Sequence, residues 1–192
     1  MSRYLPIFGG VLAALAVCAA LWFMLAPRIL DRADGGIGRG DYVLETTAGE
    51  KFTQSWLAGK PTAVFFGFTH CPDVCPTTLG DIMGWQEALG DRADGLRIAF
   101  VTVDPQRDTV AMLNDYVSWL PNAVGVTGSE EEVKKAEKAF GAYSRAVPIS
   151  GGDYTMEHTS KVILFDRNGT FNSLISYQEA TDSVLAKIEP LL

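Results

Sequence analysis

The sequence is poor in cysteine and histidine, which bind soft metal ions, and in residues that carry positive charge. Its 192 residues include three cysteines and two histidines, and 16 lysines and arginines against 23 aspartates and glutamates give a net charge of −7. Such an acidic chain lacks the basic surface that displaces counterions from nucleic acid, which argues against a nucleic-acid-binding protein. Cys18 lies in an apolar run, where we expect it to pack without chemistry. Thiol chemistry is therefore expected at Cys71 and Cys75.

One long stretch lacks charge altogether. Residues 7–26, IFGGVLAALAVCAALWFMLA, are twenty uncharged residues, enough to cross the apolar core of a bilayer. The run is long for a cleaved signal peptide, and it shows no clear A-x-A cleavage site. Val17 and the apolar residues after Cys18 disfavour a lipoprotein anchor. We expect a short tail over 1–6, an uncleaved transmembrane helix over 7–26 and a flexible, glycine-rich linker over 27–40.

The short N-terminus before this anchor favours an orientation that leaves the rest of the chain outside the cytoplasm. We expect a single-pass protein of the inner membrane whose C-terminal domain lies in the periplasm, or in the intermembrane space of a mitochondrion. In such an oxidising compartment, Cys71 and Cys75 would tend to form a disulfide.

The rest of the chain, residues 41–192, has the pattern of one α/β domain with a central mixed β-sheet flanked by helices. Apolar runs at 62–68 and 96–103 predict strands that are buried on both faces. The Asn168-Gly169 pair predicts a hairpin turn. The other expected elements are hairpin strands at 42–44 and 51–53 and at 161–165 and 171–177, helices at 77–89, 110–120, 129–140 and 178–189, and a short strand at 122–126.

The segment FTHCPDVCP, residues 68–76, places two thiols between a predicted strand and a predicted helix. Pro76 has no amide hydrogen and suits the first turn of a helix, so Cys75 is expected at or just before the helix N-terminus. The helix dipole and the free amides there favour a thiolate. Cys71 and Cys75 are four residues apart, which suits two thiolates that bind one soft metal ion, such as Cu(I) or Zn(II), or that form a disulfide.

A third ligand would usually be a histidine, and the chain offers His70 and His158. His70 adjoins Cys71, and an extended backbone would turn its side chain away, so we expect it to form a local hydrogen bond or to pack. An isolated histidine such as His158 is more often a satisfied surface or core residue than a ligand. A structural zinc site would usually need a fourth protein ligand. The residues alone leave the role of His158 open.

Three blocks, FFGFTHCPDVCPTTL, VTVDPQRDT and DYTMEHTSKVILFDRNG, resemble the Sco/SenC family in order and spacing. The resemblance extends from about Asp41 to the C-terminus. It implies a thioredoxin-like fold with CxxxC in place of CxxC. The family's copper ligands fall on Cys71, Cys75 and His158, and the aspartate of its DPxRDT block falls on Asp104, where a supporting role near the metal is expected.

The resemblance also implies a function and partners. The protein would be a membrane-anchored copper metallochaperone that carries Cu(I), with Cu(II) as a further cargo, to the dinuclear copper site of cytochrome c oxidase subunit II. A thioredoxin-like reductant and an upstream copper donor would be further partners. Met156 and Glu157 depart from the family pattern, in which a branched aliphatic residue and Asp or Ser are commoner at these positions.

The alternative is an enzyme, a thiol–disulfide oxidoreductase that keeps the cysteines of the same copper site reduced. It would need only Cys71 and Cys75. The longer spacing between these cysteines and the match at His158 favour metal transport, which is not catalysis.

Overall fold

The computed structural model describes residues 36–192, of which Ile37–Leu192 form one compact unit. The predicted tail at 1–6, the predicted anchor at 7–26 and most of the predicted linker lie outside the described residues. Within residues 36–192, no helix combines the length and the apolar character needed to cross a bilayer.

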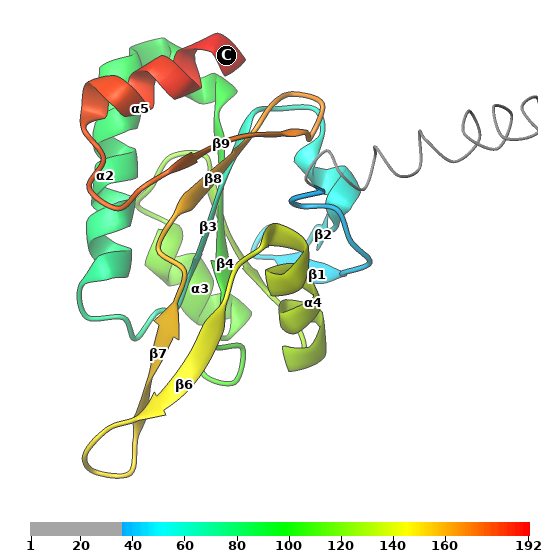
Figure 1. The fold of residues 1–192 in the computed structure, drawn as a ribbon, viewed down its shortest axis with the longest axis vertical. Coiled ribbons are helices and arrows are strands. Elements are labelled where there is room, and N and C mark those ends of the chain that lie inside the picture. The colour runs from blue at the N-terminus through cyan, green and yellow to red at the C-terminus, as the bar shows by residue number, and fades with distance from the viewer. Residues whose placement is uncertain (1–35) are drawn as a thin grey trace, which may run out of the picture. The chain divides into compact units, whose positions relative to one another are not determined.

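A seven-stranded mixed sheet forms the centre of the domain, with strand order β2-β1-β5-β4-β3-β8-β9 (Figure 1). Strands β3, β4 and β5 are parallel, whereas β1 is antiparallel to β5 and β8 is antiparallel to β3. The strands are β1 (Leu44–Thr46), β2 (Lys51–Phe52), β3 (Thr62–Gly67), β4 (Arg97–Thr102), β5 (Ala123–Thr127), β8 (Val162–Phe165) and β9 (Phe171–Ile175). The predicted α/β class with a mixed central sheet is confirmed.

Helices cover both faces of this sheet. Phe65 and Phe100 are paired neighbours on β3 and β4, so they share one face, and the ring of Phe100 packs on Tyr116 of α3 at 5.3 Å. Phe66 points to the other face, where its ring lies 5.3 Å from Phe140 of α4. The helices are α2 (Val74–Leu89), α3 (Val110–Val117), α4 (Glu130–Phe140) and α5 (Thr181–Ile188), and α5 lies beside α2 (Figure 1).

Several predicted boundaries are confirmed by local chemistry. The Ser129 hydroxyl accepts a hydrogen bond from the Glu132 amide at the start of α4, and Gly141 ends that helix in the left-handed conformation with φ 64°. Strand β3 is buried along its whole length, as the apolar run predicts. The Asn168-Gly169 turn joins β8 and β9, with Gly169 at φ 74°.

Two helices start at other positions than predicted. Helix α2 begins at Val74, because the Thr77 amide bonds the carbonyl of Asp73 and closes a first turn before the predicted start. Cys75 is therefore inside the first turn of the helix, and Pro76 follows it at a position whose amide needs no partner. Helix α5 begins at Thr181, three residues after its predicted start. Gln178 has a left-handed backbone conformation (φ 55°), which is not helical, so it belongs to the preceding loop.

A second, two-stranded sheet was not predicted. Strands β6 (Ser144–Pro148) and β7 (Tyr154–His158) form an antiparallel hairpin that extends away from the central sheet (Figure 1). The Gly151-Gly152 pair makes the turn, with φ angles of 92° and 83°. This pair was the signal in the sequence that could have revealed the hairpin. His158, expected in a segment before a strand, is instead the last residue of β7.

Candidate metal centre

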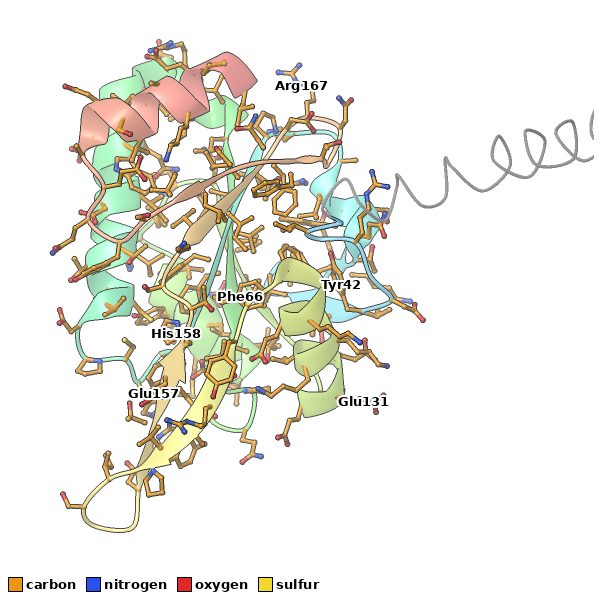
Figure 2. All side chains as sticks on the ribbon, viewed as in Figure 1. Tyr42, Phe66, Glu131, Glu157, His158 and Arg167 are labelled. Atoms are coloured by element: carbon orange, nitrogen blue, oxygen red, sulfur yellow. The ribbon has the colours of Figure 1, made fainter. Side chains whose placement is uncertain are left out.

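Three segments bring the two thiols and one imidazole together. Cys71 follows β3, Cys75 is the second residue of α2, and His158 ends β7. Figure 2 shows His158 at the place where the hairpin meets the central sheet. Their donor atoms all lie within 4.8 Å of one another. Cys75 Sγ and His158 Nε2, 83 positions apart in sequence, are separated by 3.5 Å. The fold thus places all three predicted ligands in one cluster.

The ring of His158 is held in one orientation. Its Nδ1 lies 2.9 Å from the carbonyl oxygen of Thr159, which can only accept, so Nδ1 carries the proton and donates it. The rings of Phe65 and Phe68 pack edge-on against the imidazole at 6.2 and 5.8 Å. These contacts leave the lone pair of Nε2 directed to the sulfur atoms, as in a metal-binding histidine.

The two thiols have different environments. Cys75 is fully buried, whereas Cys71 is half-buried, and its sulfur accepts a hydrogen bond of 3.4 Å from the Cys75 amide. The hydrogen bond from the Cys75 thiol, helped by backbone amides, lowers the pKa of Cys71 to about 5. The same bond and burial raise the pKa of Cys75. Cys71 is therefore the more acidic of the two thiols.

The cluster is open on one side. Cys71 and His158 line a cavity of about 320 Å³ together with Pro72, Val74 and Met156. Since Cys75 is buried beneath them, an incoming donor atom would meet Cys71 and His158 first.

Gly67 allows the close packing of Cys75, which sequence reasoning missed. A Cβ atom at Gly67 would lie 2.8 Å from Cys75 Sγ and 2.7 Å from the Phe100 ring. These distances are shorter than van der Waals contact, so the sulfur occupies space that a side chain would fill.

Asp104 makes its side-chain hydrogen bonds outside the cluster of Cys71, Cys75 and His158. Its buried carboxylate accepts hydrogen bonds from Arg107 Nε at 2.5 Å and from the Tyr154 hydroxyl at 2.9 Å. Within the described part of the chain, it forms no hydrogen bond with Cys71, Cys75 or His158. Its expected role near a metal stays a prediction.

Asp108 is the aspartate that fixes the cysteine loop, and sequence reasoning missed it. It is fully buried and accepts hydrogen bonds from the Thr69 amide at 3.1 Å and the Thr69 hydroxyl at 2.6 Å, and from the Thr102 hydroxyl at 2.6 Å. Its place in the DPQRDT block, between two polar residues, was the available signal. His70 bonds Thr69 locally at 3.1 Å and is not part of the cluster, as predicted.

The donor set suits a soft metal ion. Two sulfur atoms and one imidazole nitrogen match Cu(I), which accepts few and soft ligands. Zn(II) in a structural site usually takes four protein ligands, and the cluster supplies three.

Curated proteins of two organisms are similar to this chain in sequence. The mitochondrial protein SCO1 of Saccharomyces cerevisiae is 35% identical over 159 residues, which cover 78% of this chain and 54% of the yeast protein. The mitochondrial SCO2 homolog of Danio rerio is 37% identical over 140 residues, which cover 70% of this chain and 50% of the fish protein. The chain thus spans about half the length of these curated relatives.

Solved structures of two Sco proteins are similar to this chain in fold. Copper-bound ScoI of Bradyrhizobium japonicum is 39% identical with a TM-score of 0.73, covering 81% of this chain and 99% of that one. Copper-bound ScoI of Arabidopsis thaliana is 30% identical with a TM-score of 0.73, covering 80% and 99%. These matches confirm the expected thioredoxin-like α/β fold. The family model described as SCO1/SenC matches residues 31–192, and the chain belongs to this family.

Proposed function

We propose that this protein is a copper metallochaperone that binds Cu(I) through Cys71, Cys75 and His158. The approach of two sulfur atoms and one imidazole nitrogen to within 4.8 Å of one another carries the proposal. Thiolate ligands select soft ions, and the free lone pair of His158 Nε2 completes a three-coordinate site. The copper bound in two relatives of 39% and 30% identity supports this assignment.

The same geometry supports release by ligand exchange. Loading requires the Cys75 thiol to lose its proton, because only thiolates bind the ion. An acceptor thiolate would enter through the cavity, replace Cys71 first and leave the buried Cys75 as the last donor. The copper ion keeps its oxidation state throughout, and the Cys75 thiolate takes up a proton again once the ion has left.

We further propose the destination and place of this exchange. The acceptor is the dinuclear copper site of cytochrome c oxidase subunit II, in line with the family to which the chain belongs. Residues 7–26 anchor the protein in the inner membrane, and residues 27–40 connect the anchor to the domain in the periplasm or intermembrane space. An upstream donor supplies copper, and a thioredoxin-like reductant keeps Cys71 and Cys75 reduced.

A Cu(I) competition titration of the reduced full chain tests the ligand assignment. We expect His158→Ala to bind Cu(I) at least about tenfold more weakly than the parent, because one of three ligands is lost. His70→Ala is the matched control and should bind as the parent does, since His70 is outside the cluster. Equal affinity of the parent and His158→Ala would refute the assignment.

The lowered pKa of Cys71 favours a second function, that of a thiol–disulfide oxidoreductase. The Cys71 thiolate would attack a disulfide of the acceptor and form a mixed disulfide. Cys75 would then attack the Cys71 sulfur and release the acceptor as a dithiol, leaving this protein with a Cys71–Cys75 disulfide. The test supplies apo acceptor whose cysteines are already reduced. If copper delivery then no longer needs this protein, the reductase function is favoured over the chaperone.

A further inference from the structure

We infer that Met156 is an additional ligand for the copper cargo and that its thioether sulfur binds the ion from the open side of the site. This inference rests on the proposed function, because it concerns the same ion. It assigns a donor to the one side of the cluster that the cysteines and His158 leave open.

The strand geometry places Met156 beside His158. Both belong to β7, and residues two apart on a strand point to the same face, about 6.6 Å apart along the backbone. The residue opposite Met156 on β6 is Ala146, whose single methyl group leaves space on that face. Strand β7 is held in place by the hydrogen bond between Tyr154 and Asp104, so the spacing between Met156 and the cluster is set by the fold.

The cavity connects Met156 to the cluster. Met156 lines the same cavity of about 320 Å³ as Cys71 and His158, and it is half-buried. It also lines a second cavity, of about 330 Å³, beside α4, so its partly buried side chain borders two open spaces. A methionine side chain has three rotatable bonds, and in such a position it can turn toward either space.

The neighbours of Met156 do not offer a competing donor. Glu157 lines the same cavity, but its carboxylate accepts a hydrogen bond of 2.7 Å from Arg145 on β6. A carboxylate is also a hard ligand that suits Mg²⁺ or Ca²⁺, whereas a thioether is soft and neutral and suits Cu(I). Met156 is therefore the cavity residue whose chemistry matches the proposed cargo.

A weak bond from the Met156 thioether would mainly change the rate at which Cu(I) is released. A long, weak bond from a methionine occurs in blue-copper sites, whose other ligands are one cysteine and two histidines. Here it would cover the open side of the ion until an acceptor thiolate replaces it, and it would slow the loss of Cu(I) to other chelators. The methionine stands where a branched aliphatic residue is commoner in the family pattern, so the effect would distinguish this chain.

The experiment combines two measurements on the reduced full chain under anaerobic conditions. The first follows the methionine methyl resonances by NMR while one equivalent of Cu(I) is added, with Met156 assigned from its absence in Met156→Leu. The second measures the rate at which Cu(I) passes to a chelator. Met112, which is exposed on α3, is the internal control in the first measurement. Met156→Ile, a second variant with an apolar side chain, is tested in the second.

We expect the Met156 resonance to shift with one equivalent of Cu(I) while that of Met112 does not, and both variants to release Cu(I) about tenfold faster than the parent. The inference is wrong if the Met156 resonance does not shift or if the variants release copper at the parent's rate. The proposed function stands in that case, provided that the parent binds Cu(I) and Cys71→Ser does not. If the parent itself fails to bind Cu(I), both fail.

Discussion

Tyr154 donates a hydrogen bond of 2.9 Å to the buried carboxylate of Asp104, which joins β7 to the end of β4. Arg107 strengthens this junction, because it bonds Asp104, donates to the Tyr154 carbonyl at 2.9 Å and stacks on the Tyr154 ring at 3.8 Å. His158 lies four residues further along β7. The contacts of Asp104 therefore fix a strand that carries a candidate ligand, although Asp104 does not contact that ligand.

We expect Tyr154→Phe to weaken both the fold and the site. Loss of a hydrogen bond to a buried carboxylate should lower the free energy of unfolding by about 1.5–3 kcal/mol. Greater freedom of β7 should lower Cu(I) affinity by about tenfold, as changes in residues that orient metal ligands do. Chemical denaturation and a Cu(I) competition titration measure the two effects.

Tyr143→Phe is the control for this substitution. Tyr143 precedes β6, its side chain is 57% exposed, and its hydroxyl has no hydrogen-bond partner among the residues described. Neither stability nor copper affinity should change in this variant. Should Tyr154→Phe lose stability yet bind Cu(I) as tightly as the parent, the junction would be purely structural.

Asp108→Asn should loosen the loop that leads into Cys71. The asparagine side chain has one acceptor and presents an NH₂ group where the aspartate accepts hydrogen bonds from Thr69 and Thr102. We expect a loss of about 1–3 kcal/mol in the free energy of unfolding and faster hydrogen exchange at the Thr69 amide. Asp115→Asn, on the exposed face of α3, should change neither. Unchanged exchange at Thr69 would contradict the anchoring role.

The two thiols should react with iodoacetamide in very different pH ranges. The thiolate is the nucleophile, so alkylation of Cys71 should rise as the pH increases through its pKa of about 5 and should be near its maximum at neutral pH. Cys75 has a raised pKa and should remain largely unmodified there. Mass spectrometry of the reduced, metal-free chain between about pH 4 and pH 9 measures both.

Cys71→Ser provides the matching test. It removes the thiolate that accepts the hydrogen bond of Cys75, so alkylation of Cys75 should begin at lower pH than in the parent. Equal reactivity of the two cysteines in the parent would show that they do not share a proton in this way.

The sequence predicts the central sheet well, because its strands are encoded by short-range signals. The apolar runs of β3 and β4 and the Asn168-Gly169 turn act within a few residues, and all three appear in the structure. The β6–β7 hairpin was missed because its strands are only partly buried and lack an apolar pattern, so the Gly151-Gly152 turn was its main local signal.

The candidate site shows the same contrast between features with a local sequence signal and features without one. Cys71 and Cys75 were found from their spacing, but composition alone left His158 undecided, and only the resemblance to a family selected it. Its approach to Cys75 depends on a contact between residues 83 positions apart, which no local pattern encodes. Asp108 and Gly67 were missed for a related reason, since a buried carboxylate and an absent side chain acquire their roles only once the chain is packed.

Gly67→Ala tests whether the packing around Cys75 matters for the metal. The new methyl group would lie 2.8 Å from Cys75 Sγ, and the Phe100 ring at 2.7 Å prevents it from moving away. We expect a loss of about 1–3 kcal/mol in the free energy of unfolding, as in other overpacked cores. Because the sulfur must shift, Cu(I) affinity should fall as well, by about tenfold.

Gly80→Ala is the matched control, since it makes the same chemical change within the exposed face of α2. A Cβ there meets nothing within 4 Å, and alanine favours a helix over glycine by about 0.5–1 kcal/mol, so this variant should become more stable and bind Cu(I) like the parent. Denaturation and Cu(I) competition on both variants separate the two effects. A Gly67→Ala variant that is less stable but binds Cu(I) normally would mean that Cys75 reaches the metal from a shifted position, and that the close packing serves the core alone.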